Sequence, residues 1–354
     1  MTLPSPHRAN TAATTRPADA RRPRARAPRA YPDLMRAPTL TLRGVVPPLC
    51  TPLTPTGDVD TASLRRLAEH VIAAGAHGVF ALGSSGEAAY LSDAQRRTAL
   101  ATVVEAVDGR VPVLAGVIDM TTARVLDHAR AAAGAGADGI VATAPFYTAT
   151  HPAEIADHFR RLREGAGLPV FAYDIPSAVH TKLPAATVLA LAEDGTLAGL
   201  KDSSGADGPL RRLLVELRQR GLGDSFAVLT GSELAVDGAL LAGAHGVVPG
   251  LGNVDPHGYV RLYEHARAGR WREAAAEQDR LAALFSIIDA GDEALMSRSS
   301  SALGAFKAAL HLLGVIDCPA TAAPQLPLDD TAVKHVRGLL AAAGLLQGPE
   351  KRLP

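Results

Sequence analysis

A lysine and a tyrosine stand at the ends of two successive apolar runs. Residues 168–173 end on the phenol of Tyr173, and residues 197–200 are followed directly by Lys201. Because burying an ammonium group costs several kcal/mol, the protein must either pair this charge or favour the neutral amine, which is a nucleophile toward carbonyl groups. Tyr173 could carry protons for that chemistry. The alternative is that Lys201 pairs with Asp202 at a loop mouth and that Tyr173 only packs.

A glycine- and serine-rich stretch, GSSGE at residues 83–87, has the composition of an anion-binding turn. Glycines such as Gly86 allow unusual backbone angles, and successive N–H groups can form a nest for an anion. The hydroxyls of Ser84 and Ser85 add hydrogen-bond donors. The stretch therefore suits a carboxylate or a phosphate, although an ordinary Gly/Ser loop has the same composition.

The elements that position these groups follow a repeated pattern of apolar run, loop, alanine-rich amphipathic helix and glycine-containing turn. Eight runs are candidate strands: residues 44–49, 78–82, 111–115, 139–142, 168–173, 197–200, 226–229 and 245–248. Helices are expected to begin near Thr61, Ser92, Thr121, Pro152, Pro184, Gly208 and Glu233. Alternating strands and helices require parallel pairing, and continuous apolar runs indicate strands buried on both faces. Eight such units predict an α/β fold, a closed (β/α)8 TIM barrel rather than an open doubly wound sheet.

The pattern changes to helices alone after Asp255, which predicts a C-terminal helical appendage. We expect three parts: residues 1–42 as a disordered tail rich in Arg, Pro and Ala, residues 43–268 as the barrel, and residues 269–348 as helices packed on it. A transit peptide and a nucleic-acid-binding arm are the alternatives for the tail. A short motif recurs three times, as GAHG, GADG and GAHG, beginning at Gly75, Gly136 and Gly243. Each first glycine is expected to follow a helix and to have a positive φ.

The composition limits the possible partners. Lys and Arg together equal Asp and Glu at 36 each, so no overall field favours nucleic acid or membranes. The only cysteines, Cys50 and Cys318, form neither a disulfide framework nor a metal motif, which favours a cytoplasmic location. No apolar run approaches the roughly 20 residues that span a bilayer.

Active sites of such barrels lie at the carboxyl ends of the strands. Tyr147 follows the fourth run and His180 lies in the loop after the fifth, whereas His77 and His245 precede strands at the opposite end, where stability is the expected role. An amine, phenols, hydroxyls and an anion nest together suit iminium chemistry on a keto acid. Without a His/Asp/Glu triad at these ends, we expect no metal and no cofactor.

Three motifs in order carry a family resemblance: GSSGE at 83–87, YDIP at 173–176 and GLKDSSG at 199–205. Over about residues 43–315, including AGAHGVVPGLGN and FKAALHLLG, the chain resembles the dihydrodipicolinate synthase / N-acetylneuraminate lyase family of pyruvate-dependent class I aldolases. The resemblance implies that Lys201 is the Schiff-base lysine, Tyr173 the proton shuttle and Ser84 part of the proton relay. It implies that Tyr147 completes the relay of a neighbouring subunit in a homotetramer, a dimer of dimers.

The resemblance also implies which residues contact substrate. Ser85 would hold the carboxylate of pyruvate, Val248 would line its site, and others would contact the distal substrate. The expected substrate-binding residues are Ser85, Gly86, Ser203, Gly231, Glu233, Val248 and His180. The small-molecule partners would be a 2-oxo acid and an aldehyde.

Two departures bear on the substrate. Ala178 stands where the synthases carry an arginine that grips the carboxylate of the second substrate, and losing such a clamp costs a few kcal/mol of binding. Asp174 replaces the usual Asn of YDIP. We therefore favour a lyase or aldolase with a sugar-acid-like aldehyde over a 4-hydroxy-tetrahydrodipicolinate synthase, which joins pyruvate to aspartate semialdehyde, although His180 could partly substitute for the arginine.

Two further alternatives stay open. One is a non-catalytic barrel that binds an oxo acid. The other is a phosphate-binding barrel enzyme that uses the loop PGLGN at residues 249–253, which has no Lys or Arg nearby.

Overall fold

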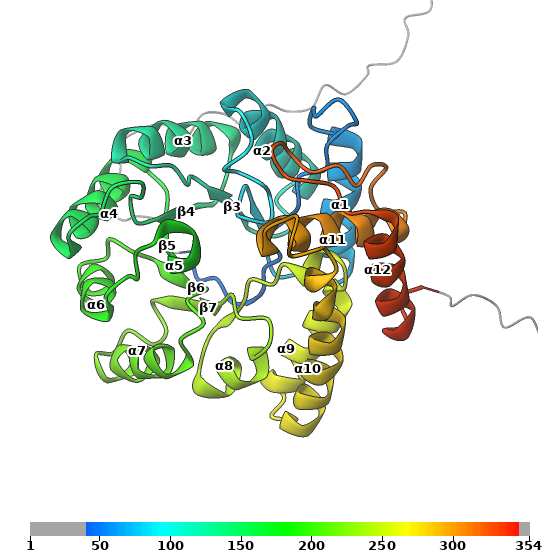
Figure 1. Cartoon of the computed structure of the whole chain (residues 1–354). Coiled ribbons are helices and arrows are strands. Elements are labelled where there is room, and N and C mark those ends of the chain that lie inside the picture. The colour runs from blue at the N-terminus through cyan, green and yellow to red at the C-terminus, as the bar shows by residue number, and fades with distance from the viewer. Residues whose placement is uncertain (1–39, 347–354) are drawn as a thin grey trace, which may run out of the picture. The chain divides into compact units, whose positions relative to one another are not determined.

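The computed structural model describes residues 40–346, whose strands form one eight-stranded parallel sheet (Figure 1). The strands are β1 (Gly44–Val45), β2 (Val79–Ala81), β3 (Val113–Gly116), β4 (Gly139–Thr143), β5 (Val170–Asp174), β6 (Gly199–Asp202), β7 (Ala227–Thr230) and β8 (Gly246–Val247). β1 pairs with β8, and a parallel bridge from Pro48 to Phe80 joins the β1 segment to β2, which closes the sheet. The predicted (β/α)8 barrel is confirmed.

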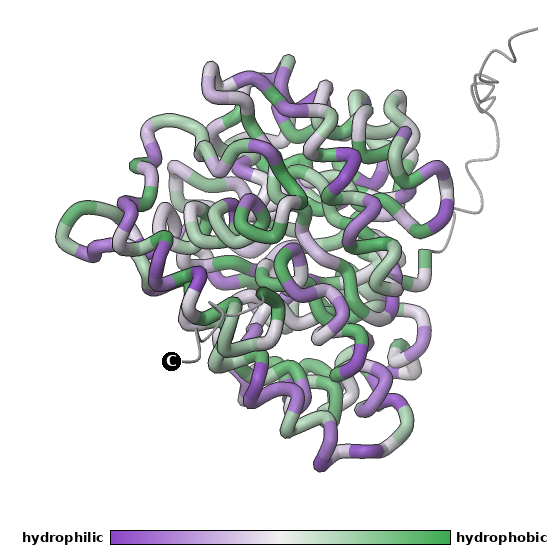
Figure 2. The backbone as a smooth tube through the Cα atoms, turned by 90° about the vertical axis from the view of Figure 1, so that its right-hand side faces the viewer, coloured by the Kyte–Doolittle hydropathy of each residue, from purple (hydrophilic) through white to green (hydrophobic). Residues whose placement is uncertain are grey.

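The helices follow the strands around the barrel. They are α1 (Thr61–Ala73), α2 (Asp93–Val107), α3 (Thr122–Ala135), α4 (Pro152–Ala166), α6 (Ala185–Glu193), α7 (Asp207–Gln219), α8 (Val236–Ala242) and α9 (Pro256–Arg267). Side-chain caps fix several starts: Asp60 accepts from the N–H of Ser63, and Ser92 forms a capping box with Gln95. Hydrophobic and hydrophilic stretches alternate along the chain trace (Figure 2), as strand runs alternating with amphipathic helices require.

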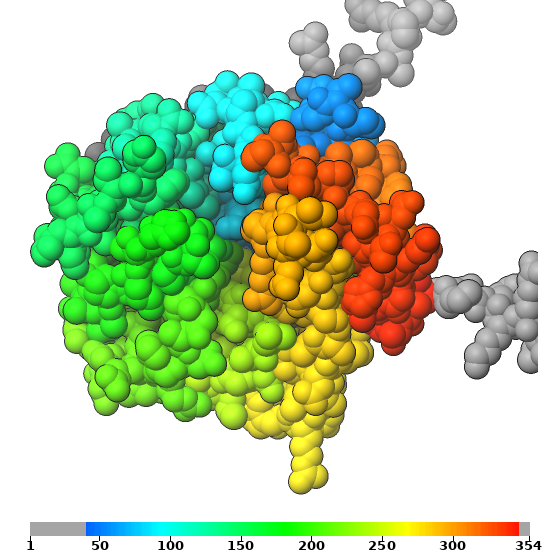
Figure 3. Space-filling view, viewed as in Figure 1, coloured from blue at the N-terminus to red at the C-terminus, as the bar shows by residue number. Residues whose placement is uncertain are grey.

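The C-terminal part is helical, as expected. It contains α10 (Trp271–Phe285), the 3-10 turn η2 (Ser286–Asp289), α11 (Arg298–Leu312) and α12 (Asp330–Ala342). α10 packs against α9, and the chain that follows α11 contacts α1 (Figures 1 and 3), where Arg66 pairs with Asp317 at 2.6 Å.

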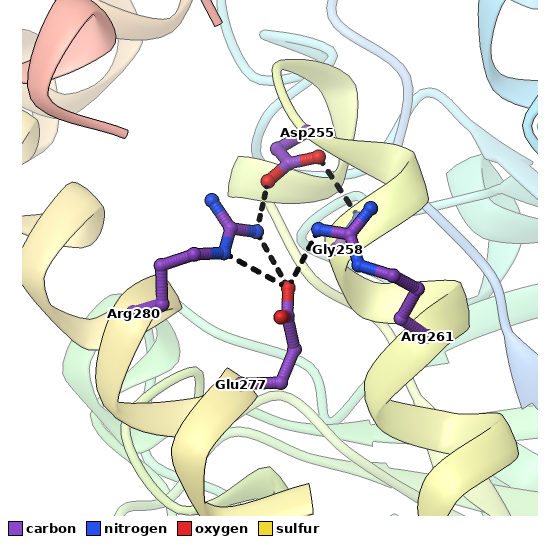
Figure 4. Close-up of polar contacts among 5 residues, drawn as sticks. All are labelled: Asp255, Gly258, Arg261, Glu277 and Arg280. Atoms are coloured by element: carbon purple, nitrogen blue, oxygen red, sulfur yellow. Dashed lines mark hydrogen bonds and ion pairs between the residues drawn. The ribbon is translucent and has the colours of Figure 1, made fainter. Parts of the chain in front are cut away.

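A polar cluster ties α10 to the last barrel helix, α9 (Figure 4). Arg280 contacts both Asp255 and Glu277, Arg261 donates to Glu277 at 2.8 Å, and the N–H of Gly258 donates to Asp255 at 2.9 Å. Asp255 and Glu277 therefore each have one partner on α9 and one on α10. These contacts join α10, the first helix after the barrel, to α9.

Side chains of the strands divide between two cores. On β4, Ile140 and Ala142 pack against the surrounding helices, whereas Val141 packs inside the barrel with Phe171 and Tyr173 of β5. This alternation decides which residues near the strand ends face the barrel mouth.

The turns before the strands match their sequence signals. Gly75, Gly136 and Gly243 have φ of +92°, +92° and +104°, which confirms the predicted left-handed helix ends. His77 and His245 each accept a hydrogen bond from a strand N–H at the end of the barrel away from the site, in accord with a structural role.

Some predicted boundaries were wrong by a few residues. Lys201 lies within β6 and Tyr173 within β5, each one residue before the strand's end, because parallel pairing continues through Asp202 and Asp174. The short helix α5 (Pro176–Val179) was not predicted, and the helix expected near Glu233 begins at Val236.

Two expectations concern the ends of the chain and the membrane. The tail predicted for residues 1–42 lies almost wholly outside the described residues. Among residues 40–346, no helix has the length and apolarity needed to cross a membrane.

Candidate active site

Lys201 and Tyr173 are paired neighbours on β6 and β5. Lys201 is 7% exposed, and its Nζ lies 4.0 Å from the centre of the Tyr173 ring and 5.1 Å from that of Phe80. The faces of these rings attract a cation. No carboxylate oxygen among residues 40–346 lies within 4.0 Å of this nitrogen. The amine is therefore enclosed in the barrel mouth without an ion-pair partner.

Asp202 is not that partner. Its Oδ1 accepts hydrogen bonds from the N–H and the hydroxyl of Ser204 at 2.8 and 2.7 Å, and its Oδ2 lies 3.9 Å from Nζ of Lys182. Successive residues of a strand point to opposite faces, so Lys201 and Asp202 diverge. The alternative interpretation, an ion pair between them, is wrong.

The phenol of Tyr173 joins the amine to the serine-rich loop. Its oxygen lies 3.4 Å from Oγ of Ser84. Burial by itself raises the pKa of Tyr173, but the charge of Lys201 and hydrogen bonds with Ser84, Lys201 and Ser203 outweigh it and leave the pKa below its ordinary value. The phenol therefore gives up its proton more readily than a free tyrosine does, as a proton shuttle requires.

The GSSGE loop is held tightly against the top of the barrel. Ser84 is exposed, Ser85 is half-buried and Gly86 is buried. A side chain at Gly86 would bring a Cβ to 3.0 Å from the carbonyl oxygen of Leu49, so only glycine fits without movement. The hydroxyl of Thr51 donates to the carbonyl of Gly86 at 2.8 Å, which fixes the loop from below.

A fully buried ion pair anchors the same loop to the C-terminal helices. Glu87, the last residue of the motif, pairs with Lys307 of α11, and neither side chain is exposed. Glu87 also accepts from the N–H of Ala322 at 2.6 Å and from Gln325 at 2.8 Å, and Lys307 donates to the carbonyl of Ala320 at 2.7 Å. This link was not predicted from the sequence, although FKAALHLLG contains Lys307 and GSSGE contains Glu87.

The departure at Asp174 has its own counter-ion. Asp174 is buried, forms an ion pair with Lys182 and accepts from the N–H of Leu183 at 3.1 Å. Burial raises its pKa, and nearby Asp202 adds to that rise, while Lys182 and the N–H of Leu183 oppose it. The pairing of Asp174 with Lys182 was also not predicted from the sequence. The signal for it is that Lys182 follows Asp174 by eight residues in YDIPSAVHTK.

The structure brings three further predicted residues to the same mouth. Ser203 lies near Tyr173, whose pKa it lowers, and a Cβ at Gly231 would collide with the Ser203 hydroxyl, so glycine makes room for it. Val248 packs in the inner core with Tyr173.

Glu233 faces the loop after β8. Its Oε1 accepts from the N–H of Leu251 at 2.7 Å and from the hydroxyl of Tyr259 at 3.0 Å. Burial raises its pKa to about 7, against the effect of these hydrogen bonds and of Lys201. The carboxylate of Glu233 thus occupies the N–H of Leu251. A phosphate or other anion bound at residues 249–253 would need this N–H.

Tyr147 and His180 are not gathered with these groups in the single chain. Tyr147 is 89% exposed with a φ of +79°, and His180 is exposed with a φ of +56°. Ala178, at the position of the missing arginine, is exposed on α5. A role for Tyr147 across a subunit interface stays a prediction.

Comparison with known proteins places this site in a family. The model of the Dihydrodipicolinate synthetase family matches residues 41–343. The chain belongs to this family. It is 35% identical over 307 residues to an uncharacterized DapA-like lyase of Halobacterium salinarum, covering 87% of this chain and 96% of that protein. It is 34% identical over 241 residues to a 4-hydroxy-tetrahydrodipicolinate synthase of Porphyromonas gingivalis, covering 68% of this chain and 80% of the synthase.

Solved structures agree with the fold. YagE, a prophage protein of the dihydrodipicolinic acid synthase family from E. coli K12, was solved in complex with pyruvate. It matches with a TM-score of 0.80 at 28% identity, covering 87% of this chain and all of YagE. The dihydrodipicolinate synthase of Bacteroides thetaiotaomicron matches with a TM-score of 0.79 at 30% identity, covering 87% of this chain and 100% of the synthase. This chain is thus a lyase of the dihydrodipicolinate synthetase family.

Proposed function

We propose that the protein is a class I aldolase in which Lys201 forms a Schiff base with pyruvate or a close 2-oxo acid. The observation that carries this proposal is the enclosed amine of Lys201, 4.0 Å from the Tyr173 ring centre and without a carboxylate partner. The pyruvate complex of YagE supports the choice of oxo acid. An unpaired, desolvated amine next to a proton-transferring phenol is what imine formation needs.

The reaction follows from the positions of these groups. The amine of Lys201 adds to the keto carbon, the keto oxygen leaves as water, and the resulting iminium loses a proton from C3 to give an enamine. The enamine carbon then adds to an aldehyde, or the reverse sequence releases one. Tyr173, hydrogen-bonded to Ser84, moves protons to and from the oxygens, while the N–H groups and hydroxyls of Ser84 and Ser85 hold the carboxylate. The N–H groups of Gly86 and Glu87 instead donate to the carbonyls of Gly83 and Ser84 within the loop.

We assign a sugar-acid-like aldehyde as the second substrate. Ala178 offers no guanidinium, and Lys182 is held by Asp174 and Asp202, so neither binds a second carboxylate. The hydroxyl of Ser203 at the mouth suits a hydroxylated aldehyde. The second candidate is a 4-hydroxy-tetrahydrodipicolinate synthase, which the 34% identity to the Porphyromonas gingivalis synthase supports.

Borohydride reduction in the presence of pyruvate tests the shared chemistry. The intact protein should gain the mass of one reduced three-carbon acid, and no gain would favour a non-catalytic oxo-acid-binding barrel. Pyruvate release from a panel of 2-oxo-3-deoxy sugar acids, measured beside condensation with aspartate semialdehyde, separates the two substrates. Faster turnover of the semialdehyde than of every sugar acid would show that the protein is a synthase despite Ala178.

The assembly and location predicted from the sequence belong to the same proposal. We propose a homotetramer located in the cytoplasm. The 89% exposure of Tyr147 supports the assembly, because in the single chain this phenol is not gathered with Lys201 and Tyr173. Sedimentation of the full chain tests the assembly.

A further inference from the structure

Thr143, the last residue of β4, carries a buried hydroxyl without a partner. The residue is 3% exposed, and no hydrogen-bonding group among residues 40–346 contacts its Oγ1. Leaving a buried hydroxyl unpaired costs about 1–3 kcal/mol, and most such groups in folded proteins are satisfied. The presence of this unpaired buried hydroxyl therefore needs an explanation.

The strand pattern directs Thr143 toward the barrel mouth. Val141, two residues earlier, packs in the inner core, whereas Ala142 packs on the outer side. Because side chains alternate along a strand, Thr143 shares the inner face with Val141.

The register then places Thr143 beside the reacting groups. Thr143 is the paired neighbour of Tyr173 on β5, and Tyr173 is the paired neighbour of Lys201 on β6. Three adjacent strands thus present a hydroxyl, a phenol and an amine in one row, with the phenol in the centre. Lys201 is therefore the neighbour of Tyr173 on the β6 side, and Thr143 is its neighbour on the β4 side.

We propose that the Thr143 hydroxyl hydrogen-bonds the aldehyde oxygen of the second substrate, an inference that rests on the proposed aldolase function. When C3 of the enamine bonds to the aldehyde carbon, the π pair of the aldehyde moves to its oxygen and the enamine becomes an iminium at Lys201. The oxygen then takes the proton of Tyr173. Thr143 stabilises the negative charge that develops before this transfer, as a donor in an oxyanion hole does. Cleavage runs through the same arrangement in reverse.

The assignment separates two halves of the reaction. Imine and enamine formation from pyruvate involve Lys201 and Tyr173 but no aldehyde oxygen, so they do not need Thr143. The carbon–carbon bond step does, because only there does the aldehyde oxygen become an alkoxide.

The test compares Thr143→Val, which keeps the shape but removes the hydroxyl, with Thr143→Ser, which keeps the hydroxyl. Thr102→Val is the matched control, since Thr102 is equally buried on α2 and its hydroxyl only donates to the carbonyl of Thr98. Each variant is assayed by thermal melting, by borohydride trapping at increasing pyruvate and by hydrogen–deuterium exchange at the pyruvate methyl group. Condensation is measured with pyruvate and glyceraldehyde, glycolaldehyde or aspartate semialdehyde, using whichever the wild type consumes fastest.

We expect Thr143→Val to trap pyruvate and exchange its methyl protons like the wild type, while kcat for condensation falls about 10²-fold. Thr143→Ser should recover most of this loss. Equal kcat in the wild type and Thr143→Val overturns the inference, as does a loss of pyruvate trapping in a folded Thr143→Val. A wild type that traps pyruvate but condenses none of the three aldehydes also overturns it, whereas a wild type that fails to trap pyruvate overturns the proposed function itself.

Discussion

Lys201 and Lys307 are both buried lysines, at 7% and 0% exposure, but their surroundings differ. Lys307 pairs with Glu87, which neutralises its charge, and it also donates to the carbonyl of Ala320. Lys201 lies against the rings of Tyr173 and Phe80, with no carboxylate partner among residues 40–346. Burial alone therefore does not distinguish the two lysines, whereas the ion-pair partner does, and the proposed mechanism assigns the reaction to the lysine that lacks one.

The two lysines nevertheless serve one site. Lys307 fixes the GSSGE loop through Glu87, and Ser84 of the same loop contacts Tyr173 beside Lys201. In the proposed mechanism, Lys307 holds the scaffold and Lys201 performs the chemistry. Variants of each lysine that change stability and activity separately test this difference.

Replacing the reactive lysine should produce the largest effect. We expect Lys201→Met to reduce turnover by about 10⁴-fold or more. Its melting temperature should stay level or rise, because no buried carboxylate is left behind. Steady-state kinetics and thermal melting measure the two effects, with the exposed Lys334→Met as control. Residual turnover above one-hundredth of the wild-type rate would show that another group forms the imine.

Replacing the structural lysine should reverse that pattern. Lys307→Met leaves Glu87 buried and unpaired, so we expect it to lower the free energy of unfolding by about 3–5 kcal/mol. The double variant Glu87→Gln/Lys307→Met removes both charges and should recover a large part of the loss. Urea titrations measure each value. A Lys307→Met protein as stable as the wild type would contradict the proposed structural role.

Removing the phenol should affect catalysis more than binding. We expect Tyr173→Phe to slow turnover by about 10²–10³-fold while the pyruvate concentration that half-saturates borohydride trapping changes little. The phenol moves protons but does not hold the carboxylate, which accounts for the split. A near-normal rate in Tyr173→Phe would remove the proton shuttle from the mechanism.

The smallest effect concerns Glu233, whose pKa burial raises to about 7. Between the ordinary carboxyl pKa and pH 7 the folded protein binds more protons than the unfolded chain, so stability from this group falls as pH rises through that window. Glu233→Gln removes this dependence. Its free energy of unfolding, relative to wild type, should therefore increase by about 1–3 kcal/mol from pH 4.5 to pH 8. Urea titrations across this range would show a flat difference if Glu233 keeps an ordinary pKa.

The barrel was predictable because its signals are local and repeated. Eight apolar runs gave the strands, and Gly75, Gly136 and Gly243 gave left-handed turns where they were expected. Strand ends were missed by a few residues because pairing with neighbours, not composition, carries β5 and β6 through Asp174 and Asp202.

The site was only partly predictable because some partners are distant in sequence. Lys201, Tyr173, Ser84 and Ser203 come together as expected, since parallel strands end at the same rim. The pairing of Glu87 with a lysine more than 200 positions later depends on how α11 packs, which no local pattern specifies.

Peptide mapping of the borohydride-trapped protein tests the central claim most directly. Digestion after reduction with pyruvate should place the three-carbon adduct on the peptide that contains Lys201 and leave the Lys307 peptide unmodified. An adduct on any other lysine, or none on Lys201, would contradict the account.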